Sequence, residues 1–187
     1  MRKTEIYSLE SPYRDTLTVS GYCFGHGQKA ACIVGSLRGN EVQQLYVCSQ
    51  LVRKLQKLEA AGAVSKDKEI MVIPSVNHHA MNIGKRFWPV DNTDINRMFP
   101  GYDLGETTQR IAAGVFEKIK DYDYGIQFAS FYMPGDFIPH VRMFRTRTKG
   151  CLHCGQSAGQ RGAAALCLLT AGAKTAEAGG GGRCFQG

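Results

Sequence analysis

Residues 31–42, Ala-Cys-Ile-Val-Gly-Ser-Leu-Arg-Gly-Asn-Glu-Val, decide the fold of this chain. The stretch begins with a short apolar run of the kind that forms a strand buried in a parallel sheet. It ends at Asn40 and Glu41. Asn40 can cap a helix, and Glu41 suits the positive N-terminal end of one. The stretch therefore predicts a strand over Ala31–Leu37, then a corner, then a helix over Asn40–Ala61.

Strands and helices alternate on both sides of this corner. Strands are expected over Thr16–Cys23, Glu69–Pro74, Tyr124–Ser130 and His140–Phe144, and a second helix over Thr107–Lys120. This order predicts an α/β fold with a mostly parallel or mixed sheet flanked by helices. In such sheets the functional sites lie at the carboxyl ends of the strands.

The first expected helix is amphipathic. Apolar residues recur in it at helical spacing and are expected to form its core face: Val42, Leu45, Cys48, Val52 and Leu55. The basic residues Arg53, Lys54 and Lys57 are expected to face water.

Composition excludes several classes of protein. The chain has no run of 18 apolar residues, so we expect no contact with a membrane, and no secretory signal is visible, so we expect a cytoplasmic location. Of 23 basic and 16 acidic residues, 6 basic and one acidic residue lie in residues 144–187. The excess charge belongs to that tail, so no nucleic-acid partner is expected for the main domain. Seven cysteines without a signal peptide indicate reduced thiols.

The composition changes abruptly after Phe144. Residues 144–187 hold 4 of the 7 cysteines and 10 of the 22 glycines. We expect an incomplete α/β domain over residues 1–143, and over residues 144–187 an atypical tail that is disordered or non-native. The tail has one short apolar run, Ala163–Leu169, and no clear strand. Its Cys151-Leu-His-Cys154 pair has poor spacing to the other cysteines for a structural zinc site, and Gly179–Gly182 has the composition of a flexible linker.

A long loop, Ser75–Tyr102, carries most of the polar residues of interest. Loops of this length inside a compact domain are usually functional. The loop holds Asn77-x-x-Ala80, then Arg86, then Asp94-Ile-Asn-Arg-x-Phe-Pro-Gly. Taken alone, the last block could be a surface ion pair of Asp94 with Arg97, with Asn96 capping a turn.

Together these motifs resemble the succinylglutamate desuccinylase/aspartoacylase family, which consists of zinc-dependent deacylases related to the M14 carboxypeptidases. The resemblance covers roughly residues 20–143. It implies an M14 carboxypeptidase-like fold, truncated here, and hydrolysis of the amide of N-acyl amino acids or related small carboxylates. It also implies that Arg86, Asn96 and Arg97 bind the carboxylate of the ligand. A guanidinium suits this role because its planar fork meets a carboxylate with two parallel hydrogen bonds.

The resemblance further implies a zinc site, held by His and Glu of an H-G-x-E turn and by a His near the end of a later strand. The matching positions carry Arg38, Glu41 and Ala129. Only Glu41 is a metal ligand, because a guanidinium offers only donors and a methyl group offers no ligand atom. Zinc is therefore expected from the family but not in this chain. The general-base Glu of the family has no match here. We expect a degenerate enzyme that retains at most a carboxylate-binding site.

Alternatives remain open at this stage. An active metallohydrolase could use a relocated metal on Glu41 with His78, His79 or His140. The chain could also be an inactive fragment, whose sheet would expose an apolar edge. Arg38 and Glu41 could be a simple exposed pair at a helix start, or Arg38 could bring its charge near the zinc position and pair with Glu41.

Overall fold

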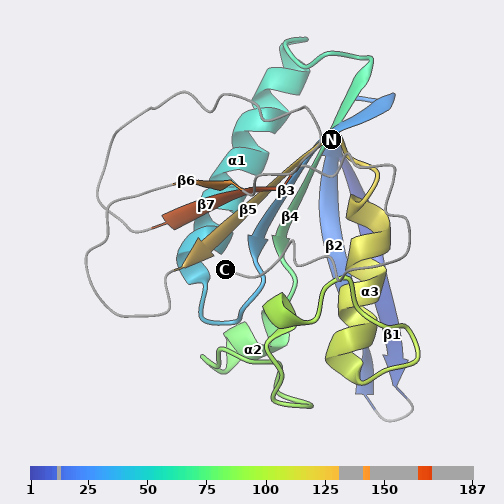
Figure 1. Cartoon of the computed structure of the whole chain (residues 1–187). Coiled ribbons are helices and arrows are strands. Elements are labelled where there is room, and N and C mark those ends of the chain that lie inside the picture. The colour runs from blue at the N-terminus through green and yellow to red at the C-terminus, as the bar shows by residue number, and fades with distance from the viewer. Residues whose placement is uncertain (12–13, 131–140, 144–163, 170–187) are drawn as a thin grey trace.

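The computed structural model describes residues 1–11, 14–130, 141–143 and 164–169. Within them a mixed sheet carries helices on both faces (Figure 1). The elements follow in this order: β1 (Arg2–Ser11), β2 (Arg14–Phe24), β3 (Gln28–Ser36), α1 (Val42–Ala60), β4 (Lys68–Ser75), α2 (His78–Asn82), the 3-10 helix η1 (Ile95–Arg97), α3 (Thr107–Ile119), β5 (Tyr124–Ser130), β6 (Val141–Met143) and β7 (Ala164–Leu169).

The sheet has the strand order β1-β2-β4-β3-β5-β7-β6. Strand β3 lies at its centre and pairs in parallel with both β4 and β5. The pairs β1–β2, β2–β4 and β5–β7 are antiparallel, so the sheet is mixed. This confirms the α/β fold class. Strand β5 is covered by β7 and is not an edge of the described sheet.

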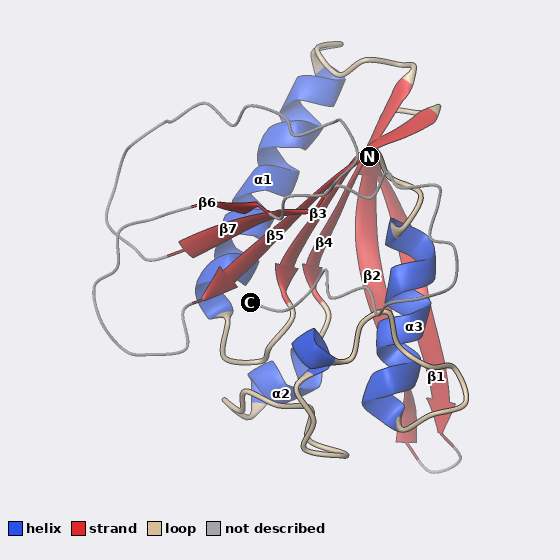
Figure 2. Cartoon of the chain, viewed as in Figure 1, coloured by secondary structure: helices blue, strands red, loops and turns tan. Residues whose placement is uncertain are grey.

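Each strand divides its side chains between two cores because successive residues point to opposite faces. Ile33 belongs to the cluster that contains Cys48 of α1, whereas its neighbours Cys32 and Val34 belong to the cluster that contains Ile111 of α3. The two long helices therefore cover opposite faces of the sheet (Figure 2).

Most of the predicted central elements are confirmed. Strand β5 has the predicted bounds, β4 contains the predicted Glu69–Pro74, and α3 begins at the predicted Thr107. The charged residues Arg53, Lys54 and Lys57 are exposed, as expected.

Some expectations about secondary structure were wrong, and one strand was missed. Helix α1 begins at Val42, and Glu41, not Asn40, is its N-cap residue. Val42 is 57% exposed while Gln44 is buried, because two residues along a helix turn the side chain by about 200°. Strand β1 was not predicted, and β7 forms within the tail, where no clear strand was expected.

The long loop is fastened to α3 at two points. The carboxylate of Asp91 accepts hydrogen bonds from Thr108 N at 2.8 Å and from Thr108 Oγ1 at 2.6 Å. Gly101 has φ 91°, and a Cβ at this position would lie 2.1 Å from Ala113 N. Only glycine meets both conditions, so the motif's final Gly serves the packing of the loop on α3.

The remaining expectations concern membrane helices, the cysteines and the tail. No helix in the described ranges is long and apolar enough to cross a bilayer. Cys23, Cys32 and Cys48 are buried free thiols. His140, the side chains of the four tail cysteines and Gly179–Gly182 lie outside the described residues.

Candidate functional site

The corner after β3 is folded around the carboxylate of Glu41. Its Oε2 accepts hydrogen bonds from Leu37 N and Arg38 N, both at 3.0 Å. Gly39 N donates to Arg86 O at 3.2 Å, and a Cβ on Gly39 would lie 2.3 Å from Lys85 O. Glycine at this position lets the corner touch the long loop directly. The Glu41 side chain closes its own turn instead of capping α1.

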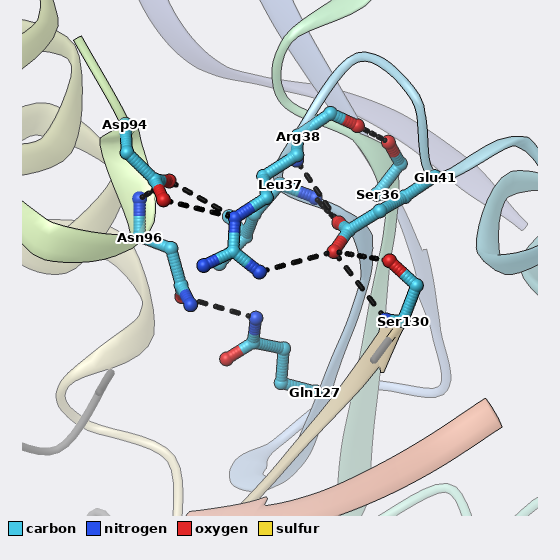
Figure 3. Close-up of polar contacts among 8 residues, drawn as sticks. All are labelled: Ser36, Leu37, Arg38, Glu41, Asp94, Asn96, Gln127 and Ser130. Atoms are coloured by element: carbon cyan, nitrogen blue, oxygen red, sulfur yellow. Dashed lines mark hydrogen bonds and ion pairs between the residues drawn. The ribbon is translucent and has the colours of Figure 1, made fainter. Parts of the chain in front are cut away.

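Arg38 is a buried cation held between two carboxylates (Figure 3). Its Nε lies 3.1 Å from both carboxylate oxygens of Asp94, and its Nη1 lies 3.5 Å from Glu41 Oε1. The Arg38 side chain is 4% exposed and that of Glu41 is fully buried. Arg38 therefore does pair with Glu41, but the pair is buried and is not the simple exposed pair that was one alternative.

The electrostatics of Glu41 reflect two opposing effects. Burial raises the pKa of its carboxyl group above the usual value, because a desolvated carboxylate is less stable. The backbone N–H of Arg38, its guanidinium, and the N–H groups of Ser130 and Leu37 lower the same pKa. These donors therefore stabilise the charged form of Glu41.

Asn96 is fixed from two directions. Its backbone N donates to Asp94 Oδ1 at 3.1 Å, and its Oδ1 accepts from Gln127 Nε2 of β5 at 3.2 Å. Both Asn96 and Gln127 are buried. The ion pair of Asp94 is formed with Arg38 and not at the surface, and Arg97 is exposed at the end of η1.

Strand β5 completes the site, partly through Ser130, to which sequence reasoning had assigned no role. Ser130 donates from N and Oγ to Glu41 Oε1, at 3.4 Å and 3.3 Å. Gln127 and Ala129 are two residues apart in β5 and so lie on one face of the strand. The carboxyl end of a predicted central strand was the available signal for Ser130.

A second group of buried polar atoms lies in residues 75–88. Four side-chain atoms there have no hydrogen-bond partner in the described part of the chain: Ser75 Oγ, Asn77 Nδ2, Arg86 Nε and Trp88 Nε1. The guanidinium carbon of Arg86 lies 5.7 Å from the centre of the Phe87 ring. These atoms are available to a ligand or to water, because buried polar groups are rarely left without a partner.

The histidines of the loop do not form a metal site with Glu41. His79 stacks on Trp88 with ring centroids 6.0 Å apart, and His78 meets His79 edge-on at 4.7 Å. Burial lowers the pKa of His78, which favours the neutral ring. Within the described ranges, no three His, Cys, Asp or Glu residues are grouped as metal ligands. Glu41, His78 and His79 are therefore not grouped as ligands in the described residues, and His140, the remaining candidate of that alternative, lies outside them.

Polar side chains converge at the strand ends of this mixed α/β sheet, and solved structures share the fold. A structure of an aspartoacylase family protein from Mesorhizobium loti matches with TM-score 0.58 and 22% identity, over 72% of this chain and 41% of that one. The product-bound ectoine utilization protein from Ruegeria pomeroyi matches with TM-score 0.58 and 20% identity, over 78% of this chain and 45% of that one.

The family itself follows from the sequence match. The model of the succinylglutamate desuccinylase/aspartoacylase catalytic domain matches residues 27–178, and the chain belongs to this family of deacylases that act on N-acyl amino acids. A curated relative, the N-alpha-acetyl-L-2,4-diaminobutyric acid deacetylase of Halomonas elongata, is 29% identical over 82 residues, which are 44% of this chain and 22% of that protein. The chain thus spans less than half the length of these relatives.

Proposed function

We propose that this chain binds a small carboxylate of the N-acyl amino acid class through Arg86, Asn96 and Arg97, and that it does not hydrolyse the ligand by the zinc-dependent route. The observation that carries the proposal is Arg86 Nε, which is buried and has no hydrogen-bond partner among the described residues. A carboxylate is the natural acceptor for this donor.

The anion site draws on two segments that meet at the corner after β3. Arg86 contacts the corner through its backbone O, and Asp94, two residues before Asn96, contacts it through Arg38. Arg97 is exposed beside the buried Asn96, so a ligand can reach it from solvent. The relative from Halomonas elongata is a deacetylase of an N-acetyl amino acid, which supports this ligand class.

The residues at the zinc position do not fit a zinc ion. Glu41 Oε2 already accepts two backbone hydrogen bonds, and Oε1 faces Arg38 and Ser130. Zinc would require a free lone pair from this carboxylate and would lie beside a permanent positive charge. Ala129 adds no ligand atom. We therefore derive no catalytic step through a metal.

Without that metal, the remaining residues bind rather than react. Arg86 and Arg97 can neutralise a carboxylate, and the Asn96 side chain can orient the group beside it. No described residue is assigned as general base. The expected behaviour is ligand binding that a chelator leaves unchanged.

Binding is tested by isothermal calorimetry with N-succinylglutamate and with the N-acetyl derivatives of aspartate, glutamate and diaminobutyrate. We expect one of these to bind, and Arg86→Gln to weaken its affinity by about tenfold, the contribution of a charge-assisted hydrogen bond. Lys85→Gln is the matched control, because it removes an exposed charge from the neighbouring residue. Absence of binding up to millimolar concentrations would remove the proposal.

The zinc statement is tested by metal analysis of the purified protein. We expect no stoichiometric zinc in the natural chain, and a gain of zinc in the double variant R38H/A129H, which supplies the two imidazoles. Stoichiometric zinc in the natural chain would contradict the proposal. Hydrolysis that a chelator abolishes would favour an active metallohydrolase instead.

A further inference from the structure

We propose that Arg38 is a positioning residue, whose buried guanidinium aligns Asn96 for the ligand by holding Asp94 against the end of β3. This inference rests on the proposed function for the purpose of the alignment. The contacts that carry it are those of the corner itself and are visible in Figure 3.

The first step is the link from Arg38 to η1. Arg38 Nε lies 3.1 Å from each carboxylate oxygen of Asp94, a residue 56 positions later in the chain. The same Asp94 Oδ1 accepts the backbone N–H of Asn96 at 3.1 Å. The Asp94 carboxylate therefore binds the guanidinium of Arg38 and also caps η1. The position of Arg38 thereby sets the position of Asn96.

The second step is the anchoring of Arg38. Its Nη1 faces Glu41 Oε1 at 3.5 Å, and Glu41 is fixed by Leu37 N and by Ser130 at the end of β5. The guanidinium is thus held by β3, β5 and the long loop together. A group held by several rigid elements keeps its geometry without help from the ligand.

The third step is why arginine suits this position better than lysine. A planar fork bonds two carboxylates in fixed directions, whereas an ammonium is a compact charge without that geometry. Gln127 Nε2 holds the Asn96 side chain from β5, so main chain and side chain of Asn96 have separate supports. Arg38 supplies the main-chain support. Because its charge is permanent, this support does not depend on any divalent cation.

The test measures the exchange of single amide hydrogens by NMR, together with ligand affinity. Arg38→Met alone leaves Glu41 buried without its cation, so the informative variant is the double substitution R38M/E41Q, compared with Glu41→Gln alone. Arg38→Lys tests rescue by charge alone. Arg53→Met is the control for loss of an arginine, because Arg53 is exposed on α1.

In R38M/E41Q we expect the amide of Asn96 to exchange about tenfold faster or more, the loss of one hydrogen bond to a charged group, while the amide of Val72 in β4 keeps its rate. Ligand affinity should fall by a similar factor, and Arg38→Lys should recover only part of both. Arg53→Met should leave Asn96 exchange nearly unchanged, and Glu41→Gln should accelerate it less than R38M/E41Q does, because Arg38 keeps its bonds to Asp94.

The outcomes separate the two proposals. Unchanged exchange at Asn96 in R38M/E41Q would overturn the positioning role, and equal acceleration at Asn96 and Val72 would overturn it as well, because that pattern reports global opening. If the natural chain binds none of the N-acyl amino acids, the proposed function fails, while the exchange rates still decide the role of Arg38.

Discussion

Arg38 and Arg86 lie close in the fold, because Gly39, the neighbour of Arg38, donates its backbone N–H to Arg86 O, yet the guanidinium groups of the two arginines have different surroundings. Arg38 is buried between Glu41 and Asp94. Arg86 is half-buried, and its Nε has no hydrogen-bond partner in the described ranges.

The difference separates a cation whose bonds are made within the protein from the cation that we propose binds the ligand. A guanidinium whose bonds are made within the protein contributes to the fold, and removing it leaves buried carboxylates unpaired. A guanidinium with an unused buried donor contributes little to the fold and is available for a ligand. Substitution of Arg38 should therefore lower the free energy of unfolding much more than substitution of Arg86.

The largest effect is expected for Arg38→Met. Removal of the cation leaves Glu41 uncompensated in the interior, which should lower the free energy of unfolding by about 3–5 kcal/mol. Urea denaturation at pH 7 measures the loss. The double variant R38M/E41Q should recover part of it. A loss below about 1 kcal/mol would place Arg38 in the same category as Arg86.

Gly39→Ala should separate the two arginines physically. Its Cβ would lie 2.3 Å from Lys85 O and 2.5 Å from Ala80 Cβ, so the corner and the loop must move apart. We expect a loss of about 1–3 kcal/mol in the free energy of unfolding, the usual cost of overpacking. Asn40→Ala is the control at the next position. Asn40 does not cap α1, so Asn40→Ala should lower the free energy of unfolding by no more than about 0.5 kcal/mol.

Cys48 extends the comparison to a buried group whose pKa is shifted by burial alone. Burial raises the pKa of its thiol to about 12. Between the unfolded value near 9 and this value, the folded chain keeps a proton that the unfolded chain has lost. Stability is therefore full below pH 9 and falls as pH rises. The loss from Cys48 should be about 1.4 kcal/mol at pH 10.

Denaturation at pH 8 and pH 10 measures this loss, and Cys48→Ala should reduce it. Part of it should remain in the variant, because burial also raises the pKa of Cys32. An unchanged alkaline loss in Cys48→Ala would contradict the assignment.

The smallest effect on stability is expected for Arg86→Met. Its Nε has no partner to lose within the part of the chain that the structure describes, so the free energy of unfolding should change by about 0.5 kcal/mol or less. Arg86→Met and Arg38→Met should be measured in the same urea series, so that their losses of stability can be compared directly. A loss as large as that of Arg38→Met would assign Arg86 to the fold.

The central sheet could be predicted because its signals are local. Buried apolar runs mark β3 and β4, and helical periodicity marks α3. Strand β1 could not be found in this way. Bulges between Glu5 and Tyr7 and between Leu9 and Ser11 break its two-residue alternation, so its pattern does not look like a strand.

The candidate site could be predicted only in part. The motifs indicated which residues to examine, and strand ends indicated where they gather. The partner of Asp94 could not be foreseen, because Arg97 is three residues away while Arg38 is 56 residues away and reaches it only through the folded sheet. The burial of Gln44 depended on where α1 begins, a boundary that local pattern fixes poorly.

The strand order explains why this corner is the place where chemistry can change. From β3 the chain passes to β4 on one side, and later it returns through α3 to β5 on the other side. The helices of these two connections, α1 and α3, cover opposite faces of the sheet, and Arg38 follows the carboxyl end of β3, where functional sites of such sheets lie. Residues at this corner lie outside the paired positions of β3. The topology thus allows the side chains of this corner to differ without rebuilding the scaffold.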